Sequence, residues 1–203
     1  MVGIRPHPLG EKHLQAGARP MAEPTYEKMH ELVGTLPFNW DEILEIDFEN
    51  LPEHLQYTST INLEAKEQKR TPTITVKIRD LDTEFSRNLV KFFESEPYNF
   101  RKSDFSLFYK PQGSTTPLHS DHHNRLRHLW NMEHIVPSRD HDIFKRYWIP
   151  LKDWSAGQYF ELNGIPLTNW KAGDIYKLKP WLPHLAADLG HDPGLRLVIT
   201  GIE

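Results

Sequence analysis

The pattern of apolar and polar residues changes character near residue 100. Before that point, residues 26–36 and 80–93 place apolar side chains at helical intervals, and the second stretch begins with carboxylates that could cap a helix. Residues 58–63 and 73–78 instead alternate apolar and polar side chains with a period of two, which is typical of strands. The N-terminal half is therefore expected to contain two amphipathic helices and two strands.

After Phe100, short β-type runs follow one another closely. We expect strands at residues 105–109, 117–121, 144–151, 157–162, 165–170, 174–178, 184–188 and 195–202. Asn163-Gly164 separates two of these runs and is a strong signal for a β-hairpin. Many short strands at close spacing predict a mainly β (α+β) fold, a double-stranded β-helix or jelly roll whose N-terminal helices buttress one sheet.

Composition separates an N-terminal segment from the rest of the chain. Residues 1–22 combine several prolines and glycines with no apolar periodicity, so we expect a flexible N-terminal arm followed by a single domain over residues 23–203. The first residues have no apolar stretch of the secretory type, and no run of about 18 apolar residues occurs anywhere. We therefore expect a cytoplasmic protein with no membrane span.

Composition narrows the possible chemistry. Cysteine is absent from the 203 residues, which excludes disulfides, zinc–thiolate sites, iron–sulfur clusters and thiol nucleophiles. Any metal must be held by histidine and carboxylate side chains. The net charge of −4, from 24 basic and 28 acidic residues, disfavours nucleic acid as a partner, and we expect a small-molecule or peptide substrate instead.

One local segment departs from this acidic balance. Residues 125–146 carry eight Arg, Lys and His side chains and lie within or beside a polar insertion at residues 124–143. A run of charge is most often a solvated surface, and that interpretation remains open. The alternative is a lid-like insertion that attracts an anionic substrate and sets specificity.

The central chemical motif is His119-Ser-Asp121. On a strand, residues two apart point to the same side, so an imidazole and a carboxylate can meet at one point. With a distant third ligand, His184, they make the two-histidine, one-carboxylate facial triad that binds iron(II) and leaves coordination positions open. His123 would share the same face of the strand and is an alternative ligand or a lining residue.

A second signal lies in the last strand. Arg196 is the one charged residue in Leu195-Arg-Leu-Val-Ile-Thr, and a buried guanidinium needs an anion, from the protein or from a ligand. Its planar fork suits a carboxylate. Tyr109 ends an earlier strand and could donate its hydroxyl to such a ligand, while Trp148 could line the same pocket; both could equally be packing residues.

These residues together resemble the iron(II)/2-oxoglutarate oxygenases, which share an ordered His-x-Asp, distal His and Arg on the next strand. Within that superfamily, residues 103–203 look most like the aspartyl/asparaginyl β-hydroxylase-like branch. The similar stretches are Arg146-Tyr-Trp-Ile-Pro-Leu, Phe160-Glu-Leu-Asn-Gly, Trp170-Lys-Ala-Gly-Asp, His184-Leu-Ala-Ala-Asp and Leu195-Arg-Leu-Val-Ile. Many members of the branch have glycine where this chain has Asp121, so the full triad is a departure towards the wider superfamily.

The resemblance implies a dioxygenase that uses iron(II), 2-oxoglutarate and O2, hydroxylates a substrate C–H, and releases succinate and CO2. It implies that Arg196 holds the remote carboxylate of 2-oxoglutarate and that Arg146 is a second contact for the co-substrate. Two other classes stay open: a cupin-like metalloenzyme that needs no oxo acid, and a non-catalytic jelly-roll binding module.

Overall fold

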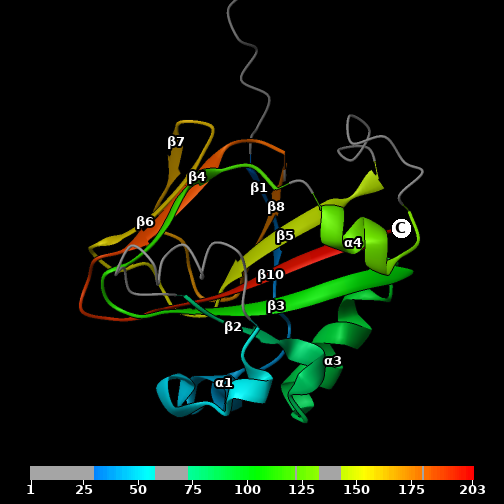
Figure 1. Ribbon diagram of the computed structural model, residues 1–203, viewed down its shortest axis with the longest axis horizontal. Helices are drawn as coiled ribbons and strands as arrows, with labels where there is room; N and C mark the ends of the chain where they lie inside the picture. The colour runs from blue at the N-terminus through cyan, green and yellow to red at the C-terminus, as the bar shows by residue number, and fades with distance from the viewer. Residues whose placement is uncertain (1–29, 58–72, 122, 133–142, 180) are drawn as a thin grey trace, which may run out of the picture.

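The computed structural model describes residues 30–57, 73–121, 123–132, 143–179 and 181–203 (Figure 1). Its strands are β1 (His30–Thr35), β2 (Ile74–Lys77), β3 (Lys102–Lys110), β4 (Ser114–His119), β5 (Lys145–Pro150), β6 (Gln158–Leu162), β7 (Ile165–Leu167), β8 (Asp174–Leu178), β9 (His184–Asp188) and β10 (Gly194–Ile202). Its helices are α1 (Asp41–Leu44), α3 (Glu84–Phe93) and α4 (Asn124–Leu129), with short 3-10 turns η1 (Phe48–Asn50), η2 (Glu53–Leu55) and η3 (Ile78–Asp80). Among the described residues, no helix is both long and apolar enough to span a membrane.

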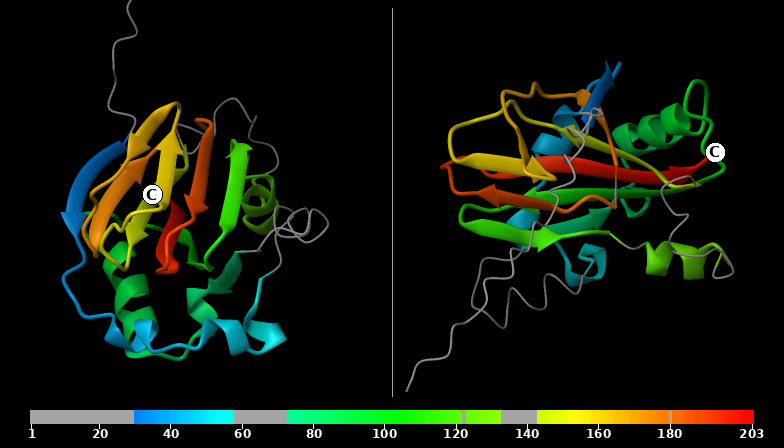
Figure 2. Two further views of the ribbon diagram at one scale, coloured as in Figure 1. Left: turned by 90° about the vertical axis from the view of Figure 1, so that its left-hand side faces the viewer. Right: turned by 90° about the horizontal axis from the view of Figure 1, so that it is seen from above.

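The strands form two antiparallel sheets. The larger sheet has the order β1-β8-β5-β10-β3-β2, and the smaller has the order β4-β9-β6-β7. Strands far apart in sequence are neighbours in both sheets, and Figure 2 shows the layers from two further sides. This is the double-stranded β-helix that the strand pattern predicts, and the Asn163-Gly164 hairpin joins β6 to β7 with both turn residues at positive φ.

The outer face of the larger sheet carries the main hydrophobic core. Leu195, Leu197 and Ile199 alternate along β10 towards this face, where α3 packs against the sheet (Figure 1). Helix α3 begins after Thr83, whose side chain caps it in a capping box, and not after Asp80 or Asp82. It buries Phe85, Leu89 and Phe93, so the predicted helical buttress of one sheet is confirmed.

The inner face of the same sheet points towards the smaller sheet. On β10 this face presents Arg196, Val198 and Thr200, because side chains two apart share a side. Thr200 pairs with Arg146 on β5 and with Asp104 on β3, so these three residues form one row across the sheet. This register decides which polar side chains line the space between the two sheets.

The expectation of a helix over residues 26–36 is wrong for the part that the structure describes. Residues 30–35 form β1, which pairs with the edge of β8. Leu32 is 56% exposed and Val33 39%, so their spacing does not build a buried helical face. Backbone pairing with an otherwise open strand edge outweighs the local pattern. Residues 1–29, which include the expected arm, and the expected strand at 58–63 lie outside the described residues.

The first part of the insertion at 124–143 is helical. Helix α4 and the residues after it bury Leu126 and Trp130 against Phe144, and the rings of Trp130 and Phe144 stack at 5.7 Å between centroids. Residues 133–142 lie outside the described part of the chain, so the lid function of the insertion stays a prediction.

Candidate metal centre

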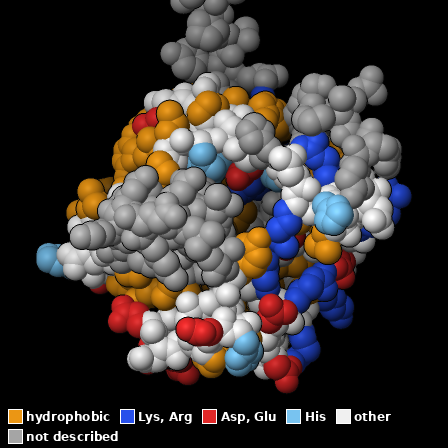
Figure 3. Space-filling view, viewed as in Figure 1, with side chains coloured by type: hydrophobic (Ala, Val, Ile, Leu, Met, Phe, Trp, Pro, Cys, Tyr) orange, Lys and Arg blue, Asp and Glu red, His pale blue; other side chains and the backbone are white. Residues whose placement is uncertain are grey.

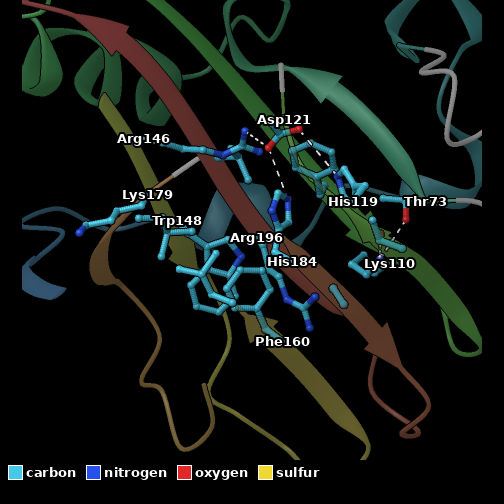
Figure 4. A pocket seen from close by; sticks show the side chains of 16 residues that line it. Thr73, Lys110, His119, Asp121, Arg146, Trp148, Phe160, Lys179, His184 and Arg196 are labelled. Carbon is cyan, nitrogen blue, oxygen red and sulfur yellow. Dashed lines mark hydrogen bonds and ion pairs between the residues drawn. The ribbon is translucent and has the colours of Figure 1, made fainter. Parts of the chain in front are cut away.

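The three predicted ligands meet at the end of the smaller sheet (Figure 4). His119 is the last residue of β4 and pairs directly with His184, the first residue of β9, and their ring centroids are 4.3 Å apart. Asp121 lies beyond the end of β4, so the strand geometry expected for residues 119–121 is wrong, and the chain reaches the site as it leaves the sheet. One ligand atom from each residue lies within 4.8 Å of the other two.

Backbone carbonyls fix the orientation of both imidazoles. Nδ1 of His119 lies 2.8 Å from the carbonyl oxygen of Pro117, and Nδ1 of His184 lies 3.0 Å from that of Leu182. An Nδ1–H that donates to a carbonyl leaves the lone pair on Nε2. Both Nε2 atoms point to Asp121, at 3.7 Å from Oδ1 for His119 and 3.4 Å from Oδ2 for His184. Carbonyl partners of this kind are typical of metal-binding histidines.

The protonation of the site suits a cation. Burial acts to raise the pKa of Asp121, but the positive charge of Arg146, with His184 and His119, outweighs it, so the pKa of this carboxyl falls below its usual value. Burial, and to a smaller extent the charge of Arg146, lowers the pKa of His184 to about 4. At neutral pH the group thus offers a carboxylate and a neutral imidazole at His184. With the carbonyl-oriented Nε2 atoms, this donor set fits a divalent transition metal such as iron(II).

A cavity of about 210 Å³ opens beside the triad, between the two sheets. Its walls are mainly apolar and include Trp148, Phe160 and Leu162, and the rings of Trp148 and Phe160 stack at 5.0 Å. Arg146 lines it at the triad end and is ion-paired with Asp121. The resemblance implies a contact between Arg146 and the co-substrate, whereas the structure gives this guanidinium an internal carboxylate partner.

Arg196 lines the other end of the cavity and is also paired inside the protein. Its guanidinium lies 2.7 Å from Oδ1 of Asp188, and the two side chains are 3% and 0% exposed. The carbon at its centre lies 5.8 Å from the ring of Trp148 and 5.4 Å from that of Trp170. The protein itself thus supplies the anion that a buried arginine requires, so burial of Arg196 alone does not imply a bound ligand.

The sequence analysis missed Lys110, a buried cation of this site, as well as Asp188, the partner of Arg196. Lys110 is 3% exposed, lines the cavity, and donates from Nζ to the hydroxyls of Thr116, at 2.9 Å, and Thr73, at 3.1 Å. Burial and the charge of Arg196 lower the pKa of Lys110 to about 7, although Asp188 acts in the opposite direction. A lysine at a strand end usually reaches solvent, and only the period of two along β3 places it inside.

The structure does not bring two of the weaker candidates to the cavity. Tyr109 lies on the outer face of the larger sheet, where its ring stacks on Phe48 at 4.9 Å and its hydroxyl donates to Glu49. Its expected contact with a ligand is therefore wrong, because residues 108 and 109 point to opposite sides. His123 follows the strand end at a positive φ and packs on Phe144, outside the cavity lining. Trp148 does line the cavity, as predicted.

Comparisons with known proteins assign no family to the chain. No family model matches it, and no curated protein matches it. Solved structures match at low similarity. A sugar phosphate isomerase of the cupin superfamily from Silicibacter pomeroyi has 9% identity and a TM-score of 0.39, with 73% of this chain and 69% of that chain covered. A predicted oxalate decarboxylase from Thermotoga maritima has 15% identity and a TM-score of 0.36, with 66% and 83% covered.

A further match is the cupin domain of Cnp3 from Schizosaccharomyces pombe, with 8% identity and a TM-score of 0.37. The alignment covers 64% of this chain and 65% of that chain, just under two thirds of its length. Likeness at this level says nothing about substrate or reaction. The features that bear on function are the double-stranded β-helix, the His-Asp-His group and the cavity between the sheets.

Proposed function

We propose that the chain is a non-haem iron(II), 2-oxoglutarate-dependent dioxygenase that hydroxylates a C–H of a small polar substrate, such as an amino acid or peptide, and releases succinate and CO2. His119, Asp121 and His184 would hold the iron. The observation that carries the proposal is a His-Asp-His group at one end of an apolar cavity whose other end carries Lys110 and Arg196.

The spacing between the two ends suits a dicarboxylic oxo acid. Along β9, His184 is followed by Ala186, which pairs with Thr116, and by Asp188, which binds Arg196. The amine of Lys110 is bonded to Thr116 and so lies roughly 7 Å along the strand from the level of His184. An oxo acid chelating a metal at the triad could therefore present its remote carboxylate to Lys110.

The charges at this end favour an anion. Arg196 and Asp188 form an ion pair, whereas Lys110 donates its hydrogen bonds to two neutral hydroxyls and is attracted by Asp188 only through space. Charge in an apolar cavity is costly unless it is paired, so a carboxylate that entered would pair with the Lys110 ammonium and stabilise it. Lys110 would thus bind the remote carboxylate, the role that the sequence analysis gives to Arg196. Arg196, paired with Asp188, would line the same end of the cavity.

Other side chains of the cavity would prepare the reaction. Arg146 holds Asp121 in place from the second carboxylate oxygen, and the carbonyls of Pro117 and Leu182 orient the imidazoles. Trp148 and Phe160 would give the centre of the cavity apolar walls that disfavour water. Bound iron(II) would supply the redox chemistry that couples decarboxylation of the oxo acid to oxidation of the substrate.

A second candidate is a metalloenzyme of the same fold that uses no oxo acid. It is favoured by the Arg196–Asp188 ion pair, since this pair leaves no unpaired guanidinium to explain. The two candidates differ in one measurable property: only the oxygenase binds 2-oxoglutarate in a metal-dependent way.

Calorimetric titration of 2-oxoglutarate into the iron(II)-loaded protein without oxygen tests the proposal. We expect saturable binding that requires the metal, and a loss of roughly 1.5–3 kcal/mol of binding free energy in Lys110→Met. Pyruvate, which lacks the remote carboxylate, serves as the matched ligand, and its affinity should be the same in wild type and variant. The proposal is overturned if the iron-loaded wild type shows no saturable binding of 2-oxoglutarate.

A further inference from the structure

A second group of cations lies at the triad end of the space between the sheets, outside the cavity lining. Lys77 on β2 donates from Nζ to both carboxylate oxygens of Asp104, at 2.9 and 2.7 Å, and to Ser106 at 2.6 Å. Arg125 on α4 donates to the same Asp104 at 3.0 Å. Both cations also lie over the ring of Tyr57, each 4.9 Å from its centroid. Among the described residues, two positively charged side chains thus share the carboxylate of Asp104, and the charge of Asp80 also acts on Lys77.

The two cations differ in what they can still bind. The three bonds of Lys77 use all three N–H donors of an ammonium group. Arg125 has five N–H donors, and among the described residues it donates one hydrogen bond, to Asp104. Its side chain is 45% exposed, whereas that of Lys77 is 19% exposed. The carboxylate and the ring of Tyr57 hold the guanidinium in place, so its remaining donors form a pre-oriented edge that faces solvent.

Sheet register places Asp104, the partner of this guanidinium, in the same row as Arg146, which contacts the metal centre. Asp104 and Arg146 pair with Thr200 from opposite sides, and neighbouring strands lie about 4.8 Å apart, so their Cα atoms are roughly 10 Å apart in one row. Arg146 contacts Asp121, and Arg125 follows Asp121 by four residues. A ligand at Arg125 could thus extend along the row to the triad.

The surface of the molecule agrees with this placement. Figure 3 shows a hollow with acidic and histidine side chains at its rim, and Lys and Arg side chains continue down one side of it. The net charge of the chain is −4, so the positive side chains along this opening are opposite in sign to the charge of the whole molecule. A local field of this sign raises the concentration of anions at the opening.

We infer that the substrate to be oxidised is a small organic anion, whose carboxylate or phosphate monoester group binds the exposed edge of Arg125. The inference rests on the proposed function for the reaction, but the anion site itself does not depend on it. The substrate would lie along the row from Arg125 to the triad, with the carbon to be oxidised roughly 10 Å or less from the anionic group.

Binding is tested first, with the manganese(II)-loaded protein saturated with 2-oxoglutarate. Inorganic phosphate and acetate are titrated separately by calorimetry into wild type, Arg125→Gln and the matched control Arg87→Gln. Arg87 is 66% exposed and pairs with Asp82 at the start of α3, away from the cavity lining. We expect at least one of the two anions to lose about tenfold in affinity in Arg125→Gln and neither to change in Arg87→Gln. Equal affinities in the two variants overturn the inference.

Turnover is tested second, with pairs of small substrates that differ only in carrying an acid or its neutral amide, or a phosphate or the free hydroxyl. In the wild type, the anionic member of a pair should stimulate succinate formation at lower KM. Arg125→Gln should raise that KM about tenfold, with kcat and the KM for 2-oxoglutarate unchanged, and Arg125→Lys should restore part of it. Preference for the neutral members overturns the inference. A protein that forms no succinate but loses phosphate binding in Arg125→Gln would overturn the proposed function and keep the anion site.

Discussion

Substitution of Lys110 by methionine tests how the buried amine changes the free energy of unfolding and its dependence on pH. Methionine keeps an unbranched chain of similar length and removes the charge. The charged groups that face the amine are Arg196 from β10 and Asp188 from β9, and its hydrogen-bond partners Thr73 and Thr116 are neutral. The pH dependence that disappears with the substitution therefore belongs to Lys110.

The magnitude follows from the pKa of Lys110, which is about 7 in the folded protein against an ordinary value of 10.5. Below pH 7 the amine is protonated in the folded and the unfolded chain, so the full cost of burying the charge is present. Between pH 7 and 10.5 the unfolded chain binds the extra proton, and the free energy of unfolding rises by about 1.4 kcal/mol per pH unit. The whole window corresponds to about 5 kcal/mol.

Urea unfolding of the metal-free wild type and Lys110→Met at pH 6 to 9 measures this difference. From pH 7 to pH 9 the wild type should gain about 2–3 kcal/mol of stability relative to the variant, and below pH 7 the difference should level off. Lys91→Met, at an exposed position on α3, is the control for loss of a surface lysine. If the stability difference between wild type and Lys110→Met stays constant from pH 6 to 9, the buried amine does not titrate in this range and the reasoning fails.

Three further substitutions and one deletion test the rest of the structure. His184→Ala should abolish binding of one iron(II) per chain, measured by calorimetry, while circular dichroism retains the β signal; a variant that still binds iron would exclude this ligand set. Asp188→Asn leaves the Arg196 guanidinium buried and unpaired and should cost about 3–5 kcal/mol in urea unfolding. Phe93→Ala opens a cavity in the outer core and should cost about 3–5 kcal/mol in the same assay. Removal of residues 133–142 should raise the KM for the oxidised substrate more than the KM for 2-oxoglutarate, and equal effects on both would argue against a lid.

The sequence by itself determines the parts of the fold that local periodicity encodes. The strands of the C-terminal half follow from short β-type runs separated by turn residues, and helix α3 follows from apolar residues at helical spacing. The hairpin at Asn163-Gly164 follows from two residues that tolerate positive φ. The candidate ligand set His119, Asp121 and His184 follows from side-chain chemistry and order, and the structure brings one ligand atom of each residue within 4.8 Å of the other two.

Only the tertiary structure decides which strands pair with one another and which side chain becomes the partner of each buried charged group. Residues 30–35 become a strand because they pair with the edge of β8. Strand β9 pairs with β4 through Ala186 and Thr116, the hydroxyl partner of Lys110, and supplies Asp188 as the partner of Arg196. Tyr109 turns outward by the same alternation that turns Lys110 inward. These outcomes depend on contacts between segments tens of residues apart, and a local pattern contains no information about the partner that a distant strand will supply.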